Sequence, residues 1–178
     1  MDAVKTWTVV GCLFLFATTL WGQEEMIPWS PDRKLKWSDF KGKPFTTEWA
    51  AATTASGISY EFSTSGTLKE MVVHFKVSTD FYPQKSWYRP ELVNDVILAH
   101  EQLHFDISEL FARKMRKQLR ETVFTRNIKE EVKEIYKQIL KELSAFQNNY
   151  DHQTNFSRNT EKQLLWNKKI AEALREEY

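Results

Sequence analysis

The hydrophobic positions of the chain follow a strand-like period before residue 90. Short apolar stretches lie at 35–40, 50–62 and 71–77. In the last of these, Val73, Phe75 and Val77 alternate with exposed-type positions, which is the two-residue period of a strand with one buried face. Gly57 predicts a bulge or bend inside the second stretch, and Gly66 predicts a hairpin turn after it. We therefore expect strands in this part of the chain.

From Pro90 onward the pattern becomes helical. Pro90 suits the first turn of a helix, and no Gly or Pro follows it. Apolar residues then recur every three or four positions in a first helix, in a second at 128–146 and in a third at about 159–177. Strands followed by helices are typical of an α+β domain, with an antiparallel N-terminal sheet and three C-terminal helices packed on it. The length of 178 residues suits one such domain.

The first 22 residues have the pattern of a secretory signal peptide. A short start with one Lys precedes a mostly apolar stretch at 7–21, and polar residues follow it. We place cleavage after Gly22, which leaves residues 23–178 as a secreted or periplasmic domain. A membrane anchor is the alternative, although the apolar run is short for one. The single Cys12 lies in this leader, so the mature chain has no thiol for catalysis or metal binding.

The composition of the chain argues against two further classes of function, nucleic-acid binding and a membrane-spanning role. The chain has 25 Lys and Arg against 24 Asp and Glu, a net charge of +1. Nucleic-acid binding usually needs a strongly basic face, so we predict no nucleic-acid partner. No run of 18 apolar residues follows the leader, so we predict no membrane span in the mature chain.

His100, Glu101 and His104 form an H-E-x-x-H motif inside the first predicted helix. Side chains four residues apart lie on one helical face, so two imidazoles there can bind one metal ion. With a third protein ligand, Zn²⁺ would keep an open position and activate a water, whose proton Glu101 can take. The alternative is a pair of buried His residues satisfied by carbonyl groups, although such burial is costly without a partner.

The third ligand is expected from the polar segment 150–156, between the second and third helices. His152 and Asp151 are the candidates; we favour His152 because imidazole is the commoner zinc ligand, with Asp151 orienting a ligand. Tyr150 lies beside them and is a candidate to stabilise the oxyanion. A plain connector between helices is the alternative interpretation of this segment.

Three other polar residues are not expected to bind the metal. His74 lies on the Lys76 side of its strand and is predicted to be exposed. Asp106 and Glu109 point away from the His pair on the helix, so we interpret them as solvated groups or outer partners of the site.

Several motifs occur in a characteristic order: Trp37-x-Asp39-Phe40-x-Gly42, His100-Glu101-Gln102-x-His104-Phe105-Asp106, Tyr150-Asp151-x-x-Thr154 and Gln163-x-x-Trp166. Together they resemble a bacterial family of unknown function described as secreted zinc-dependent proteases. The resemblance implies a minimal zincin-like metallopeptidase in which His100 and His104 bind zinc and Glu101 is catalytic. This chain has Phe156 where the family usually has a His, which removes one possible third ligand.

Two functional hypotheses follow. The first is a secreted or periplasmic zinc-dependent peptidase that hydrolyses peptide or protein substrates through a metal-activated water. Its substrate could bind as an added strand along the edge of residues 71–77. The second is a non-catalytic cell-envelope domain that binds a protein partner and carries a degenerate metal site.

Overall fold

The computed structural model describes residues 24–44, 50–66 and 72–176. The predicted signal peptide, residues 1–22, lies outside the described residues, and so does its cleavage site.

A long antiparallel hairpin forms the sheet that supports the helices. Strand β3 (Ser56–Ser65) pairs with β4 (Val72–Phe81) over ten residues. The short β1 (Ile27–Pro28) pairs with the other edge of β4, so the strand order is β1-β4-β3. A separate two-stranded sheet joins β2 (Ala52–Thr53) to β5 (Trp87–Tyr88) near one end of the hairpin.

The predicted alternation along β4 is confirmed. Val73, Phe75 and Val77 belong to the core between the sheet and the helices, whereas His74 is exposed. The predicted bulge at Gly57 is wrong, because the β3–β4 register runs unbroken through this residue. A Cβ at Gly57 would lie 2.9 Å from the hydroxyl oxygen of Tyr82, so glycine instead permits a close approach.

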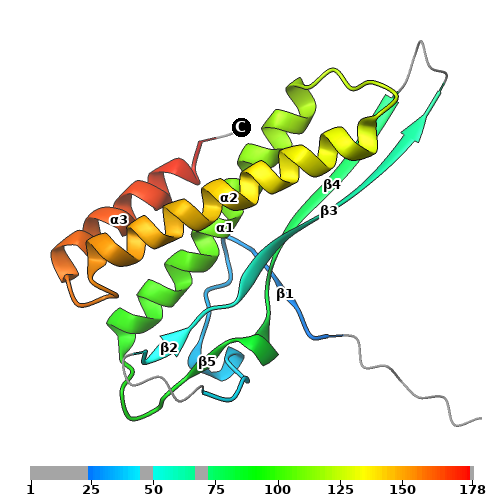
Figure 1. The fold of residues 1–178 in the computed structure, drawn as a ribbon. Helices are drawn as coiled ribbons and strands as arrows, with labels where there is room; N and C mark the ends of the chain where they lie inside the picture. Colours follow the sequence, from blue (N-terminus) through cyan, green and yellow to red (C-terminus); the bar gives the residue numbers. More distant parts are fainter. Residues whose placement is uncertain (1–23, 45–49, 67–71, 177–178) are drawn as a thin grey trace, which may run out of the picture.

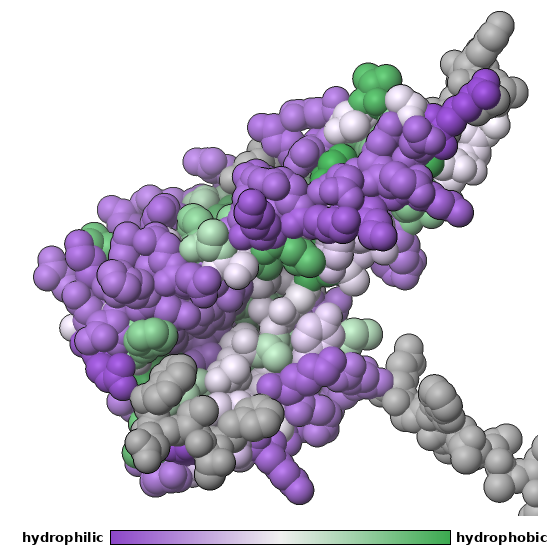
Figure 2. Space-filling view, viewed as in Figure 1, coloured by the Kyte–Doolittle hydropathy of each residue, from purple (hydrophilic) through white to green (hydrophobic). Residues whose placement is uncertain are grey.

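Three helices cover one face of the hairpin (Figure 1): α1 (Asp95–Glu121), α2 (Ile128–Thr154) and α3 (Thr160–Ala173). Helix α1 contacts both long strands as well as α2 and α3. The visible surface of the helical layer is mainly hydrophilic (Figure 2), as expected for helices that bury one face only. The predicted α+β class, an antiparallel N-terminal sheet followed by three helices, is confirmed. Within the described ranges, no helix has both the length and the apolar character needed to cross a membrane.

Helix α1 begins five residues later than predicted, at Asp95 rather than at Pro90. The cause is Asn94, whose side-chain oxygen accepts hydrogen bonds from the N–H groups of Val96 and Ile97 at 3.0 and 3.1 Å. An Asn at this position satisfies two of the free N–H groups at the helix start.

The apolar stretch at 35–40 forms a short 3₁₀ turn (Trp37–Asp39) instead of the expected strand. The Asp39 carboxylate accepts a hydrogen bond from the N–H of Lys36 at 2.9 Å, which closes the turn. Its two apolar ends, Leu35 and Phe40, enter a small second core with Phe81 and Phe105. The N-terminal segment is therefore packed against α1 close to the H-E-x-x-H motif.

Candidate metal centre

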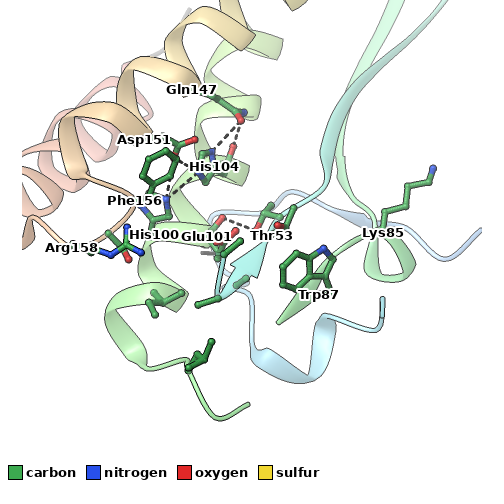
Figure 3. A pocket seen from close by; sticks show the side chains of 17 residues that line it. Thr53, Lys85, Trp87, His100, Glu101, His104, Gln147, Asp151, Phe156 and Arg158 are labelled. Carbon is green, nitrogen blue, oxygen red and sulfur yellow. Dashed lines mark hydrogen bonds and ion pairs between the residues drawn. The ribbon is translucent and has the colours of Figure 1, made fainter. Parts of the chain in front are cut away.

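Three side chains from two helices converge on one point. His100 and His104 lie on successive turns of α1, and Asp151 lies on the last turn of α2. The Nε2 atoms of the two imidazoles are 3.3 Å apart. Asp151 Oδ1 is 3.2 Å from His100 Nε2 and 2.9 Å from His104 Nε2. These three atoms are the group in the described chain that could hold a metal ion (Figure 3).

The outer nitrogens of both imidazoles contact glutamine side chains. His100 Nδ1 lies 3.0 Å from Gln163 Oε1, and His104 Nδ1 lies 3.1 Å from Gln147 Oε1. The Gln147 amide is oriented by its own N–H groups, which donate to the carbonyl of His104 and to Ser108 Oγ. Because an amide oxygen only accepts, each Nδ1 is the donor, so in the neutral form of each ring Nε2 carries a lone pair.

The Gln163 amide is fixed in the same way. Its Nε2 donates to the Tyr150 hydroxyl at 2.7 Å and to Asn167 Oδ1 at 2.8 Å, which leaves Oε1 towards His100. Histidine ligands of metals characteristically donate their other N–H to an oxygen in this manner, which sets the tautomer and the ring orientation.

With both rings neutral, the inner atoms of the site have no proton to share. Asp151 Oδ1 is at ion-pair distance from both rings, yet it is buried and accepts no hydrogen bond. Two imidazole lone pairs and a carboxylate oxygen face one another, which is unfavourable unless a cation lies between them. A tetrahedral Zn²⁺ at about 2.0–2.1 Å from each ligand requires ligand atoms about 3.3 Å apart. The observed separations of 2.9–3.3 Å fit that requirement.

The electrostatics of the site also favour positive charge. Burial alone lowers the pKa of His104, but the contact with Asp151 and the charge of Glu101 outweigh it, so the pKa is raised. Burial tends to raise the pKa of Asp151, but the adjacent His100 and His104 hold it well below its usual range. The carboxylate is therefore ionised and available as a ligand at neutral pH.

Glu101 lies beside the three convergent atoms in an open cleft. The cleft has a volume of about 770 Å³ and is lined by Glu101, His100, His104 and Asp151. Glu101 is 5% exposed, and among the described residues its carboxylate has no hydrogen-bond or ion-pair partner. Its backbone carbonyl accepts a hydrogen bond from Thr54 Oγ1 at 3.2 Å, which ties this turn of α1 to the β2 segment. The helical turn that carries Glu101 is thus held in place, and its carboxylate is free to act on a bound molecule.

The two walls of the cleft come from segments that lie far apart in the sequence. One wall is the β2–β5 sheet, with residues 50–54 and Trp87, and the other is the turn after α2, with Phe156, Ser157 and Arg158. The predicted edge for substrate binding is residues 71–77; residue 71 lies outside the described residues, and 72–77 do not line the cleft. This stretch pairs with β3 on one side, whereas β1 pairs with β4 only at Asp80 and Phe81, so a peptide added here would lie outside the cleft.

The preference for His152 as third ligand is reversed by the structure. His152 is exposed and lies outside the group, whereas Asp151 faces the two imidazoles. The segment 150–154 is not a connector but the last turn of α2, and successive helical residues point about 100° apart, so only one of the two can face α1.

Tyr150 does not face the cleft. Its side chain is fully buried, and its ring stacks on the imidazole of His100 at 4.6 Å between centroids. Its hydroxyl lies 2.9 Å from Gln163 Oε1 and 3.3 Å from the His100 carbonyl, and burial raises its pKa above the ordinary value. The predicted oxyanion role is therefore wrong; Tyr150 supports the ligand His100 from behind.

Asp106 and Glu109 are buried, which corrects the expectation of solvated carboxylates, and neither joins the metal group. Asp106 accepts hydrogen bonds from Trp29 Nε1 at 2.7 Å and from Gln102 Nε2 at 2.9 Å. It therefore fastens the N-terminal segment to the motif helix.

Glu109 instead ties α1 to the long hairpin. It pairs with Arg113 at 3.1 Å and Arg116 at 2.9 Å, and accepts a hydrogen bond from Thr79 at 2.9 Å. Arg116 also donates to the carbonyl of Val77 in β4 at 2.9 Å.

Gln147 and Gln163 are site residues to which the sequence interpretation gave no role. The role of Gln163 could have been predicted from the sequence. It occupies the same helical face as Trp166 and Ile170, and a polar residue on a buried face needs a hydrogen-bond partner. Gln147 precedes Asp151 by one helical turn, but that spacing alone does not distinguish it from a surface residue.

The fold and site define an α+β protein with a candidate three-ligand metal centre between two helices. Residues 33–158 match the family described as "Bacterial protein of unknown function (DUF922)", and the chain belongs to this family. The resemblance to a bacterial family of unknown function is thereby confirmed. No curated protein and no solved structure matches the chain, so the zincin-like relation stays a prediction.

Proposed function

We propose that the protein is a zinc-dependent peptidase, exported through its N-terminal leader to the periplasm or the medium. The observation that carries the proposal is the convergence of His100 Nε2, His104 Nε2 and Asp151 Oδ1, without a shared proton, beside Glu101 in an open cleft. Two imidazoles and one carboxylate are a ligand set used by catalytic zinc sites, which keep a further position for water or substrate.

The three convergent residues would hold the ion, and Gln163 and Gln147 would keep the two imidazoles in the ligating tautomer. A bound Zn²⁺ would supply Lewis-acid chemistry, polarising the scissile carbonyl and making water nucleophilic at neutral pH.

Glu101 is the residue suited to move the protons. Its carboxylate can accept a proton from the attacking water and then donate it to the nitrogen of the leaving amine. Because the side chain is almost fully buried and has no protein partner among the described residues, it does not have to break an existing bond to do so.

The substrate backbone would lie along the β2 side of the cleft. Strand β2 pairs with β5 on one edge, and residues 50–54 line the cleft over the motif helix. An extended peptide could add to this segment through main-chain hydrogen bonds, with its side chains alternating towards the two walls. This places the added strand at the site itself rather than at residues 71–77.

The non-catalytic alternative depended on a missing third ligand. Asp151 is positioned to supply that ligand, so a degenerate site is no longer the simpler interpretation.

Metal analysis combined with one conservative variant tests the proposal. Protein produced with its own leader should contain about one zinc per chain and should hydrolyse an unfolded protein substrate. Glu101→Gln should keep the zinc and lose activity by about 10²–10⁴-fold, the usual contribution of general acid–base catalysis. Glu121→Gln, on the exposed end of the same helix, is the matched control and should retain activity. Zinc-loaded protein that cleaves nothing, or full activity in Glu101→Gln, would contradict the proposal.

A further inference from the structure

The turn that follows Asp151 has an unusual backbone. Asn155, Phe156 and Ser157 have φ values of 47°, 50° and 71°, and they are the only non-glycine residues with positive φ in the described part of the chain. The left-handed conformation is unfavourable for an ordinary side chain, because its Cβ comes too close to the following carbonyl oxygen. Asn tolerates it, whereas Phe and Ser adopt it rarely. Such strain persists where the surrounding structure fixes it, and it is enriched at functional sites.

Hydrogen bonds fasten this turn to the metal centre. The N–H of Phe156 donates to the carbonyl of Asp151 at 2.9 Å, and the N–H of Asn159 donates to the carbonyl of Thr154 at 2.8 Å. The position of Phe156 is therefore coupled directly to the backbone of a candidate ligand.

The left-handed turn brings an aromatic ring to the cleft. Phe156 is 48% exposed and lines the cleft, and Figure 3 shows its ring beside Asp151, with Trp87 on the opposite side. Leu92 and Ile97 add apolar surface to the same lining. An apolar side chain of a bound peptide would bury surface here, a gain of roughly 25 cal/mol per Å².

The same turn supplies a cation. Arg158 lines the cleft, makes one long hydrogen bond of 3.5 Å to the Asn155 carbonyl, and forms no ion pair with the described residues. The other lining cation, Lys85, is already paired with Glu24. The carboxylates of the lining, Glu101 and Asp151, both belong to the metal site. With a divalent ion bound, the cleft would carry a net positive charge and would attract an anionic group.

We infer that the turn at residues 155–158 selects the substrate: an acidic peptide with a bulky apolar side chain next to the scissile bond. The apolar side chain packs against Phe156, and a carboxylate near it binds the guanidinium of Arg158 as a charge-assisted pair. The inference rests on the proposed peptidase activity and adds the class of substrate. Phe156 is thus a specificity residue.

Four quenched fluorescent peptides of equal length test the inference. They carry Leu or Ser at the residue next to the scissile bond, each combined with Glu or Gln two residues away. Wild-type, zinc-loaded protein should cleave the Leu–Glu peptide best, with each feature raising kcat/KM at least tenfold. Phe156→Ala should remove the preference for Leu and keep that for Glu, and Arg158→Gln should do the reverse. Lys162→Gln, an exposed cation outside the cleft, should change neither preference.

A second variant distinguishes the loss of the aromatic ring from misfolding of the turn. Phe156→Gly removes the same ring but suits the left-handed backbone, so it should fold at least as stably as wild type and should show the same loss of preference. Cleavage of all four peptides at equal rates, or an equal loss on all four in the Phe156 variants, would overturn the inference while the peptidase proposal stands. No cleavage of any peptide by the zinc-loaded protein would overturn both.

Discussion

Replacement of Asp151 by Asn tests the central feature of the site, the third ligand. The change keeps the size of the side chain and removes its charge. Asp151 Oδ1 lies 3.2 and 2.9 Å from the two Nε2 atoms, and the side chain is 24% exposed. As the order of magnitude for the lost attraction between the carboxylate and a bound cation we take about 3 kcal/mol, the lower end of the cost of breaking a buried charge pair. About 3 kcal/mol corresponds to a loss of about a hundredfold in zinc affinity.

The assay is competition for zinc between metal-stripped protein and a fluorescent chelator at neutral pH. His152→Asn is the matched control, because His152 lies one residue away on the same helical turn and is exposed. We expect less than a twofold change in that variant. Equal losses in both variants, or a larger loss in His152→Asn, would refute the assignment of Asp151 as the ligand.

Three further predictions concern the surroundings of the site. Gln163→Leu removes the acceptor that fixes the tautomer of one ligand and should weaken zinc binding by about 10–100-fold, measured by the same competition, whereas the exposed Gln138→Leu should not. The pKa of His104 is raised above its ordinary 6.5, so protons should displace zinc increasingly as the pH falls through that raised value. Stability of the metal-free protein should change in the opposite sense: the contribution of His104 is complete below its unfolded pKa and is lost as the pH rises through the folded pKa. Thermal melting with and without zinc across this range measures both trends, and parallel trends would contradict them. Glu109→Gln should lower the free energy of unfolding by about 3 kcal/mol, because it leaves buried partners unsatisfied. The exposed Glu134→Gln is the control and should leave the denaturant midpoint almost unchanged.

The sequence by itself determined the fold class and the two helical ligands. Residues four apart on a helix share a face whatever the rest of the fold does, so the H-E-x-x-H spacing already brings His100 and His104 together. The alternation of apolar residues along β4 and their helical period along α2 likewise require only that each element buries one face. Both patterns are confirmed in the structure.

Only the tertiary structure decided which neighbour completes the site. Asp151 and His152 are adjacent in the sequence, and the choice depends on the rotation of α2 about its axis, which packing against α1 and α3 fixes. The buried roles of Tyr150 and Gln163 follow from the same packing, because their partners lie on other helices. The left-handed turn at Phe156 is also a tertiary result, since Phe and Ser have no local preference for that conformation and are held in it by the hydrogen bonds that close α2.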